Sequence, residues 1–319
     1  MKTRRFKAKA CNHIYQRTIN RFNIFYDMSD YLSYFTIFSM TAIKSEVLVL
    51  GLCLMIDHIH MLVSAPDKTT LSRFISSVTS VFVRQYNTDI GRTGPLFEKR
   101  FGSAPKAERK KLISAIIYLA NNPVEKNICR LAEEYRWNFI APMASSHPFS
   151  DKVVRKNVRY RLRKALKTVD WYREHERYMT SKVIYNMMIG MSRTEKSQLT
   201  DYIIMKYNVI AYDKLQKIFG SYEQLLTAIH STTGSEYDLD EHRDKLPDSI
   251  YRDFIAYLRT NFSDKVRKVT ICSSAEKLEL AHLLRIHTVA PLSQIYKFLH
   301  LKEEMKCNKV IQREIQKIG

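Results

Sequence analysis

Two apolar runs dominate the hydrophobic pattern of the first third of the chain. Val47–Ile56 is rich in apolar residues, and Met61–Val63 follows it after a short polar break. Such runs are typical of central strands that are covered on both faces. We therefore expect Glu46–Met55 and His58–Ala65 to pair as a hairpin. Cys11–Ile19 alternates well enough for another strand, and a few residues of strand are expected near Gly102–Lys106.

Three segments between these strands repeat apolar residues at helical spacing. Asp27–Asp30 offers caps for a helix that runs to about Lys44, and its aromatic residues are expected in the core. Residues 70–88 predict an amphipathic helix packed on the sheet. Residues 107–122 predict a third helix, which Pro123 should stop because proline lacks the backbone N–H.

The second part of the chain has only helical periodicity. Pro142–Ser150 has the composition of a linker, and residues 152–167 hold eight Lys and Arg with no acidic residue, in a helix-compatible stretch that ends near Trp171. Short helices are expected over residues 180–231 and 250–262, separated by a polar loop. The predicted domains are 1–142, a basic segment 143–175 and a helical region 176–319.

The pattern at the C-terminal end resembles a helix-turn-helix unit over about residues 274–316. Ser274 is expected to cap its first helix, and Pro291 to open the second. A third helix would begin at Lys302 and present groove-facing residues, namely Lys302, Lys306, Asn308 and Lys309. The same pattern also fits a small helical bundle used for dimerisation.

The net charge indicates the class of binding partner. The 319 residues carry a formal net charge of +20, and both halves of the chain have an excess of Lys and Arg. This balance favours a polyanionic partner, which means nucleic acid or an anionic membrane surface. The longest apolar run is about half of the ~20 residues that a membrane-spanning helix needs. Five scattered cysteines and a basic N-terminus without an apolar stretch favour the cytoplasm.

Two pairs of residues carry candidate chemistry. His58 and His60 are two apart in a predicted strand, so their imidazoles share one face and could ligate one divalent metal. Tyr118 and Asn122 are four apart in a predicted helix and therefore share one helical face. On spacing alone, a polar patch beside a turn, a half-buried aromatic residue and a plain helix stop are the better interpretations.

Four landmarks lie in order along the first part of the chain, namely YQRTINRFNIF, LMIDHIHMLV, GPLFEKRF and IIYLANNPVEKNI. Together they resemble the REP-associated tyrosine transposases, which belong to the HUH superfamily of single-strand DNA nucleases and transposases and have an IS200-like transposase domain. The resemblance covers roughly residues 10–142. It implies an α+β fold with a ferredoxin-like antiparallel sheet, followed by a mostly helical region. One departure is visible: the family commonly has Pro-Asn before the first histidine, and this chain has Ile56-Asp57.

The resemblance also implies roles for particular residues. Tyr118 matches the nucleophilic tyrosine, and His58, His60 and Asn122 match the ligands of Mg²⁺ or Mn²⁺. The implied reaction is cleavage and rejoining of single-stranded or hairpin DNA through a 5′-phosphotyrosine, in a homodimer at the nucleoid. Two alternatives remain open, a related nickase without transposition and a domesticated, non-catalytic DNA-binding protein or repressor.

Candidate DNA-binding residues come from three basic segments. The helix expected over residues 70–88 contributes two arginines, the glycine-rich loop before residue 102 contributes Lys99 and Arg100, and the stretch 152–167 contributes the rest. Cations interleaved with aromatic residues, as in that loop, are typical of single-stranded nucleic-acid surfaces. The full set is Arg73, Arg84, Lys99, Arg100, Arg155, Lys156, Arg159, Arg163 and Lys164.

Overall fold

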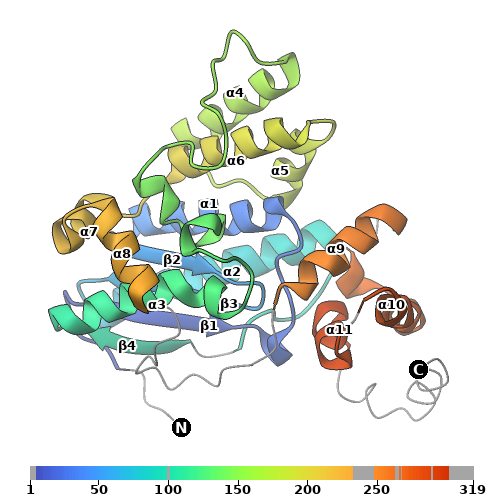
Figure 1. Ribbon diagram of the computed structural model, residues 1–319, viewed down its shortest axis with the longest axis horizontal. Helices are drawn as coiled ribbons and strands as arrows, with labels where there is room; N and C mark the ends of the chain where they lie inside the picture. Colours follow the sequence, from blue (N-terminus) through green and yellow to red (C-terminus); the bar gives the residue numbers. More distant parts are fainter. Residues whose placement is uncertain are drawn as a thin grey trace.

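The structure, a computed structural model, describes residues 5–98, 101–232, 248–262, 266, 268–288 and 290–301. Its first part is built on a four-stranded antiparallel sheet with the spatial order β2-β3-β1-β4 (Figure 1). The strands are β1 (Cys11–Arg17), β2 (Leu48–Leu54), β3 (His58–Ser64) and β4 (Gly102–Lys106). With α1 (Met28–Lys44), α2 (Lys68–Ile90) and α3 (Arg109–Glu125), the chain order is βαββαβα. The ferredoxin-like α+β fold is confirmed.

The two faces of the sheet are covered by different helices. Gln16 on β1 hydrogen-bonds Thr79 of α2 at 3.1 Å, which places α2 on one face. Leu119 of α3 packs 3.5 Å from the position that a Cβ of Gly51 would occupy, which places α3 on the other face. Because β3 is covered on both faces, its middle residues are all buried, as the unbroken apolar run predicts.

The start of α1 follows from its first residues. The Asp27 carboxylate accepts from the N–H groups of Ser29 and Asp30, and the Asp30 side chain closes a capping box. Tyr34, Phe35 and Phe38 are fully buried, so their helical spacing marks a core face, as predicted. Tyr31 is half-buried and stacks on Trp137 at 4.4 Å between ring centroids.

Pro123 does not stop α3, which runs on to Glu125. A proline there removes only one backbone hydrogen bond in the last turn, and the turn is still closed by the bonds from Lys126 N to Asn122 O and from Ile128 N to Pro123 O. The helix expected from residue 152 is also shorter than predicted, since α4 spans Tyr160–Glu174. Arg163 donates to the backbone carbonyls of residues 155, 156 and 158 and holds this stretch as a turn.

The helices after α4 follow the predicted periodicity. They are α5 (Ser181–Met188), α6 (Arg193–Tyr207), α7 (Tyr212–Phe219), α8 (Tyr222–Thr232), α9 (Ile250–Asn261), α10 (Ser274–His287) and α11 (Leu292–Leu299). Short 3-10 turns lie at Ile19–Arg21, Ala132–Glu134, Arg136–Asn138, Ala141–Met143 and Val269–Ile271. One apolar cluster joins the sheet to α4–α8, and a second joins α9–α11 to Tyr26 and Ile56 (Figure 1). The domain boundaries at 142 and 175 stay predictions.

Two helices of the predicted helix-turn-helix are present. The cap of α10 is Ser273, one residue before the expected Ser274, and it forms a capping box with Glu276. Pro291 precedes α11, as expected. The third helix, with Lys302, Lys306, Asn308 and Lys309, lies outside the described residues. No helix within the described ranges is both long and apolar enough to cross a membrane.

His300 makes the packing of α11 sensitive to pH. Its ring is buried, stacks on Phe22 at 4.4 Å, and its Nε2 lies 2.5 Å from the carbonyl oxygen of Asn23. Burial lowers the pKa of His300 from 6.5 to about 3. The unfolded chain therefore binds the proton more readily, so stability should fall as the pH drops below 6.5, by about 2 kcal/mol between pH 7 and pH 5.

Replacing His300 with Asn should remove this part of the pH dependence. The backbone of His300 has φ 53°, a region that asparagine tolerates well. Urea unfolding of both proteins at pH 7 and pH 5 measures the effect. An equal loss of stability in the wild type and in His300→Asn would show that His300 is not the group responsible.

Candidate active site

The two histidines of β3 point to the face of the sheet that α3 covers. His58 pairs with Arg17 of β1 and His60 pairs with Tyr15, so alternate residues of both strands share this face. The ring centroids of His58 and His60 are 4.9 Å apart and the rings are perpendicular. His60 is fully buried, whereas the side chain of His58 is 14% exposed. The strand thus presents one interior imidazole and one that solvent reaches.

A third histidine lies in the same site and was missed from the sequence. Nε2 of His13 lies 3.0 Å from Nδ1 of His60, and the two rings stack with centroids 5.1 Å apart. His13 is on β1, on the same face as Tyr15 and Arg17. The alternation of Cys11, His13, Tyr15 and Arg17 was a usable signal, but it acquires meaning only once β1 is paired with β3.

Tyr118 meets these histidines from α3. Its ring lies edge-on to His60 at 5.6 Å and to His13 at 5.8 Å, measured between ring centroids. The neighbouring Ile117 and Leu119 belong to the apolar core, whereas the phenol packs on imidazoles. Tyr118 is only 4% exposed. The structure therefore brings the predicted tyrosine and the predicted histidine pair together within one chain.

Asn122 lies one helical turn beyond Tyr118 and is also buried. Its Nδ2 donates to the carbonyl oxygen of Tyr118 at 3.1 Å, so its Oδ1 is the atom suited to a hard cation. The adjacent Asn121 donates to the carbonyl of Ile229 in α8 at 2.9 Å. This bond ties the middle of α3 to the helical region and helps to fix the orientation of the helix.

Tyr15 and Arg17 extend the site toward the end of β1. The Tyr15 ring lies over Gly102 of β4, where a Cβ would come within 1.9 Å of its Cε1. Only glycine leaves room for the ring there. The Arg17 guanidinium lies 5.6 Å from the Tyr15 ring centroid. This stacking holds the positive charge of Arg17 on β1, on the face of the sheet that His58 and His60 share.

Asp57, which departs from the family pattern, contacts His58 directly. Its Oδ1 is 2.5 Å from Nδ1 of His58, and its backbone carbonyl accepts from the backbone N–H of Thr18 at 3.0 Å. Burial raises the pKa of Asp57, but attraction to His58, with Lys297 and Lys126, outweighs it and leaves the pKa below its usual value. Asp57 is therefore both a turn residue and the hydrogen-bond partner of His58.

Residues from the C-terminal helical region also reach this end of the sheet. The backbone N–H of Asp248 donates to the carbonyl of Lys126, just after α3, at 3.0 Å. Burial and repulsion by Asp57 raise the pKa of Asp248 to about 7. Lys297 of α11 lowers the pKa of Asp57. These are long-range contacts that no local pattern in the sequence could reveal.

The residues present fit a catalytic cation with open coordination positions. His58 and His60 each engage Nδ1 with a neighbouring side chain, as metal-ligating histidines usually do. Burial, followed by the nearby His58, lowers the pKa of His60 well below its usual value, which favours the neutral form that can ligate. Within the described ranges, no three His, Cys, Asp or Glu side chains gather as a metal cage. Two imidazoles and an amide oxygen would leave the other positions to phosphate and water.

Two of the predicted DNA-binding residues of the sheet domain lie on α2, which also lines a groove. Arg73 and Arg84 are exposed on α2, and Lys99 and Arg100 lie outside the described residues. A cavity of about 480 Å³ runs between α2 and the loop that precedes β4. Hydroxyl and phenyl groups line it, namely those of Ser72, Ser76, Thr79, Ser80, Phe97 and Phe101.

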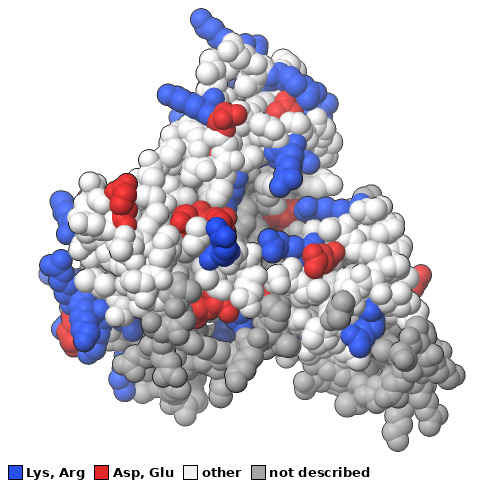
Figure 2. Space-filling model, in the orientation of Figure 1, with Lys and Arg blue, Asp and Glu red and all other residues white. Residues whose placement is uncertain are grey.

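Three arginines of the basic segment are engaged within the protein. Arg155 pairs with Asp170 at 2.5 Å, Arg159 pairs with Glu195 at 3.1 Å, and Arg163 donates to backbone carbonyls. Lys156 and Lys164 are exposed. Lys and Arg side chains project from the α4 end of the molecule in Figure 2. This end therefore offers a basic surface, although part of its charge is neutralised internally.

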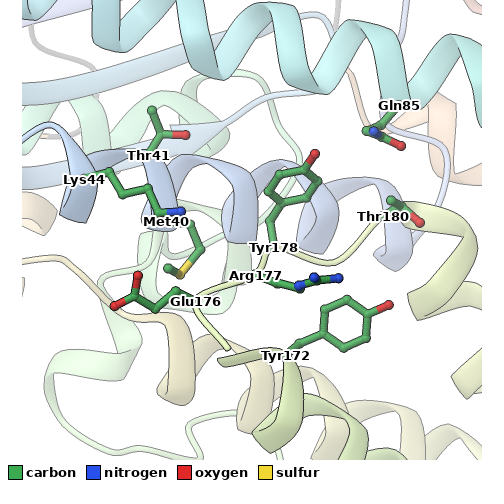
Figure 3. Close-up of a pocket in the computed structure, with 9 residues that line it drawn as sticks. All are labelled: Met40, Thr41, Lys44, Gln85, Tyr172, Glu176, Arg177, Tyr178 and Thr180. Carbon is green, nitrogen blue, oxygen red and sulfur yellow. The ribbon is translucent and has the colours of Figure 1, made fainter. Parts of the chain in front are cut away.

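A second cavity, of about 410 Å³, lies between α1, α2 and the segment that joins α4 to α5 (Figure 3). Lys44, Glu176 and Arg177 give it mixed charge, and Tyr172 and Tyr178 supply aromatic walls. The nine residues drawn around it include none of the predicted site residues. The predicted catalytic tyrosine and the predicted histidine pair lie on the other face of the sheet, under α3.

Among the comparisons with known proteins, one identifies a family for the first part of the chain. Residues 7–122 match the sequence model of the family described as "Transposase IS200 like", a stretch that contains the whole sheet and extends to Asn122. This α+β domain is therefore an IS200-like transposase domain, which confirms the resemblance seen in the sequence. The family assignment indicates transposase activity and DNA binding. No curated protein and no solved structure in the comparisons matches the chain.

Proposed function

We propose that the protein cuts and rejoins single-stranded DNA at hairpin-forming repeats, with Tyr118 as the nucleophile, in the manner of the REP-associated tyrosine transposases. The observation that carries this proposal is the contact of the Tyr118 ring with His60, whose β3 neighbour His58 shares the same face. A nucleophile beside two potential metal ligands suits metal-assisted cleavage of a phosphodiester. Acting on DNA, the protein would work at the nucleoid in the cytoplasm.

The reaction conserves the energy of the broken bond. The Tyr118 oxygen attacks the phosphorus and displaces the 3′ oxygen, which leaves as a hydroxyl after gaining the proton that the phenol loses. The product is a 5′-phosphotyrosine, which a second 3′ hydroxyl can attack to rejoin the strand. Bound Mg²⁺ or Mn²⁺ supplies neutralisation of the phosphate charge. His58, His60 and Asn122 would hold it, and Arg17 adds positive charge on the paired strand.

The proposed nucleophile and the two proposed histidine ligands lie together in one chain. Tyr118 and the histidines belong to the same molecule, so catalysis in cis is possible without exchange of helices between subunits. The homodimer implied by the resemblance would then serve to bring two DNA ends together. Because Tyr118 is 4% exposed, a local movement of the surrounding residues must admit the phosphate.

A labelled hairpin oligonucleotide with single-stranded flanks tests the proposal. With Mn²⁺ we expect a protein–DNA adduct that survives denaturing electrophoresis, and strand-transfer products when a second oligonucleotide is added. Chelation of the metal should abolish both. Adduct without strand transfer would assign a nickase, and DNA binding without adduct in any metal would assign a non-catalytic DNA-binding protein.

The groove along α2 lies on the face of the sheet opposite to Tyr118, so it is the proposed path of the DNA that flanks the cleaved phosphodiester, with Arg73 and Arg84 as its phosphate contacts. Replacing both arginines with Ala should weaken DNA binding in a salt-dependent way. The slope of log affinity against log salt should become shallower by about 1.4, since each contact to a single strand adds about 0.7. Fluorescence anisotropy at several salt concentrations measures the slope. Ser77→Ala, on the same exposed face, should leave it unchanged, and an unaltered slope in the double variant would exclude this path.

A further inference from the structure

The hydrogen bond between His13 and His60 constrains the protonation of both rings. Nε2 of His13 and Nδ1 of His60 are 3.0 Å apart, and both residues are fully buried. Between two neutral imidazoles, one nitrogen must donate the proton and the other must accept it. Since burial keeps bulk water from competing for these atoms, the pair is restricted to two arrangements.

Only one of the two arrangements is compatible with a metal on His60. If Nδ1 of His60 accepts, its proton is on Nε2, and that nitrogen has no lone pair for a cation. If Nδ1 donates, Nε2 carries the lone pair. His13 must then accept through Nε2 and keep its own proton on Nδ1.

We propose that His13 is a positioning residue that holds His60 in the Nδ1–H tautomer and thereby aims the Nε2 lone pair of His60 at the catalytic cation. This inference rests on the proposed function. His13 acts through a neighbour, and its stacking on His60 at 17° between ring planes also fixes the ring orientation. Tyr118, the proposed nucleophile, packs edge-on against both rings, so the His13–His60 pair is also in contact with the nucleophile.

The two histidines proposed as metal ligands therefore have different hydrogen-bond partners. His58 faces the carboxylate of Asp57 at 2.5 Å, whereas His60 faces a neutral imidazole. A carboxylate partner raises the basicity of a ligating histidine more than a neutral acceptor does. His60 is accordingly the weaker electron-pair donor of the two. The alignment of its ring therefore depends more on its partner His13 than the alignment of His58 depends on Asp57.

Nitrogen NMR of the metal-free protein tests the tautomer without using activity. The ¹⁵N shifts of His60 in the wild type should report the Nδ1–H form. In His13→Leu, which has no acceptor, the Nε2–H form should become populated. In His13→Gln, whose side-chain oxygen can accept, the Nδ1–H form should be retained. His147→Leu, outside the site, should leave His60 unchanged.

Mn²⁺ affinity measured by calorimetry on the same proteins gives the second readout. His13→Leu should bind about 10–100-fold more weakly than the wild type, the usual cost of losing such a partner, and His13→Gln should recover most of this loss. A wild-type His60 in the Nε2–H form overturns the inference even if Mn²⁺ binds. Unchanged tautomer and affinity in a folded His13→Leu overturn it too. A wild type that binds no Mn²⁺ instead overturns the proposed metal site and, with it, this role of His13.

Discussion

Replacement of Tyr118 with Phe is expected to abolish the covalent protein–DNA adduct completely. The substitution removes only the hydroxyl and keeps the ring that packs edge-on against His13 and His60. DNA affinity should therefore stay within about threefold of the wild type, a difference below ~0.7 kcal/mol. Denaturing electrophoresis with a labelled hairpin oligonucleotide and Mn²⁺ measures the adduct.

Tyr172→Phe is a matched control for this experiment. Tyr172 lines the cavity between α1 and α4 and has no part in the proposed chemistry. It should form adduct at the wild-type rate. Persistent adduct in Tyr118→Phe would mean that another residue is the nucleophile, and the assignment of the active site would then be wrong.

The second large effect is expected for His58→Ala. Metal-dependent cleavage should fall by at least ~100-fold, since loss of an outer partner alone often costs about 10–100-fold. His58 is the better choice for truncation because its side chain is 14% exposed and His60 is fully buried. Single-turnover cleavage at increasing Mn²⁺ concentration measures the loss.

DNA binding separates this outcome from the non-catalytic alternative. If the basic surfaces bind DNA, His58→Ala should keep the wild-type affinity in Mn²⁺-free buffer, with His147→Ala as the control. Cleavage at the wild-type rate in His58→Ala would contradict a catalytic role for the β3 histidines. Loss of DNA binding together with cleavage would indicate that the variant damages the fold rather than the chemistry.

The sheet and its helices could be predicted because local signals agree with the final packing. The apolar run of β2, the period of α2 and the capping residue Asp27 each specify an element without help from distant residues. The prediction that Pro123 stops α3 was wrong because a proline near the end of a helix removes few backbone hydrogen bonds. The start of α4 was misplaced because Arg163 donates to backbone carbonyls of residues 155, 156 and 158, a side-chain interaction that the helical period does not reveal.

The candidate site could be predicted only in part from the sequence, for the same physical reason. His58 and His60 could be paired by strand alternation, and Tyr118 and Asn122 by helical spacing, because both rules act within one element. His13 required the register between β1 and β3. Asp248 and Lys297 act from a region far along the chain, and Arg155 and Arg159, which are predicted to contact DNA, pair with Asp170 and Glu195.

The proposed chemistry depends on one cation held between β3 and α3 beside Tyr118. Anomalous diffraction from a crystal soaked with Mn²⁺ would locate this cation. We expect a single strong peak within coordinating distance of Nε2 of His58, Nε2 of His60 and Oδ1 of Asn122, with the Tyr118 hydroxyl facing it. A peak bound elsewhere, or Mn²⁺ on the histidines with the Tyr118 hydroxyl turned away, would contradict the proposed chemistry.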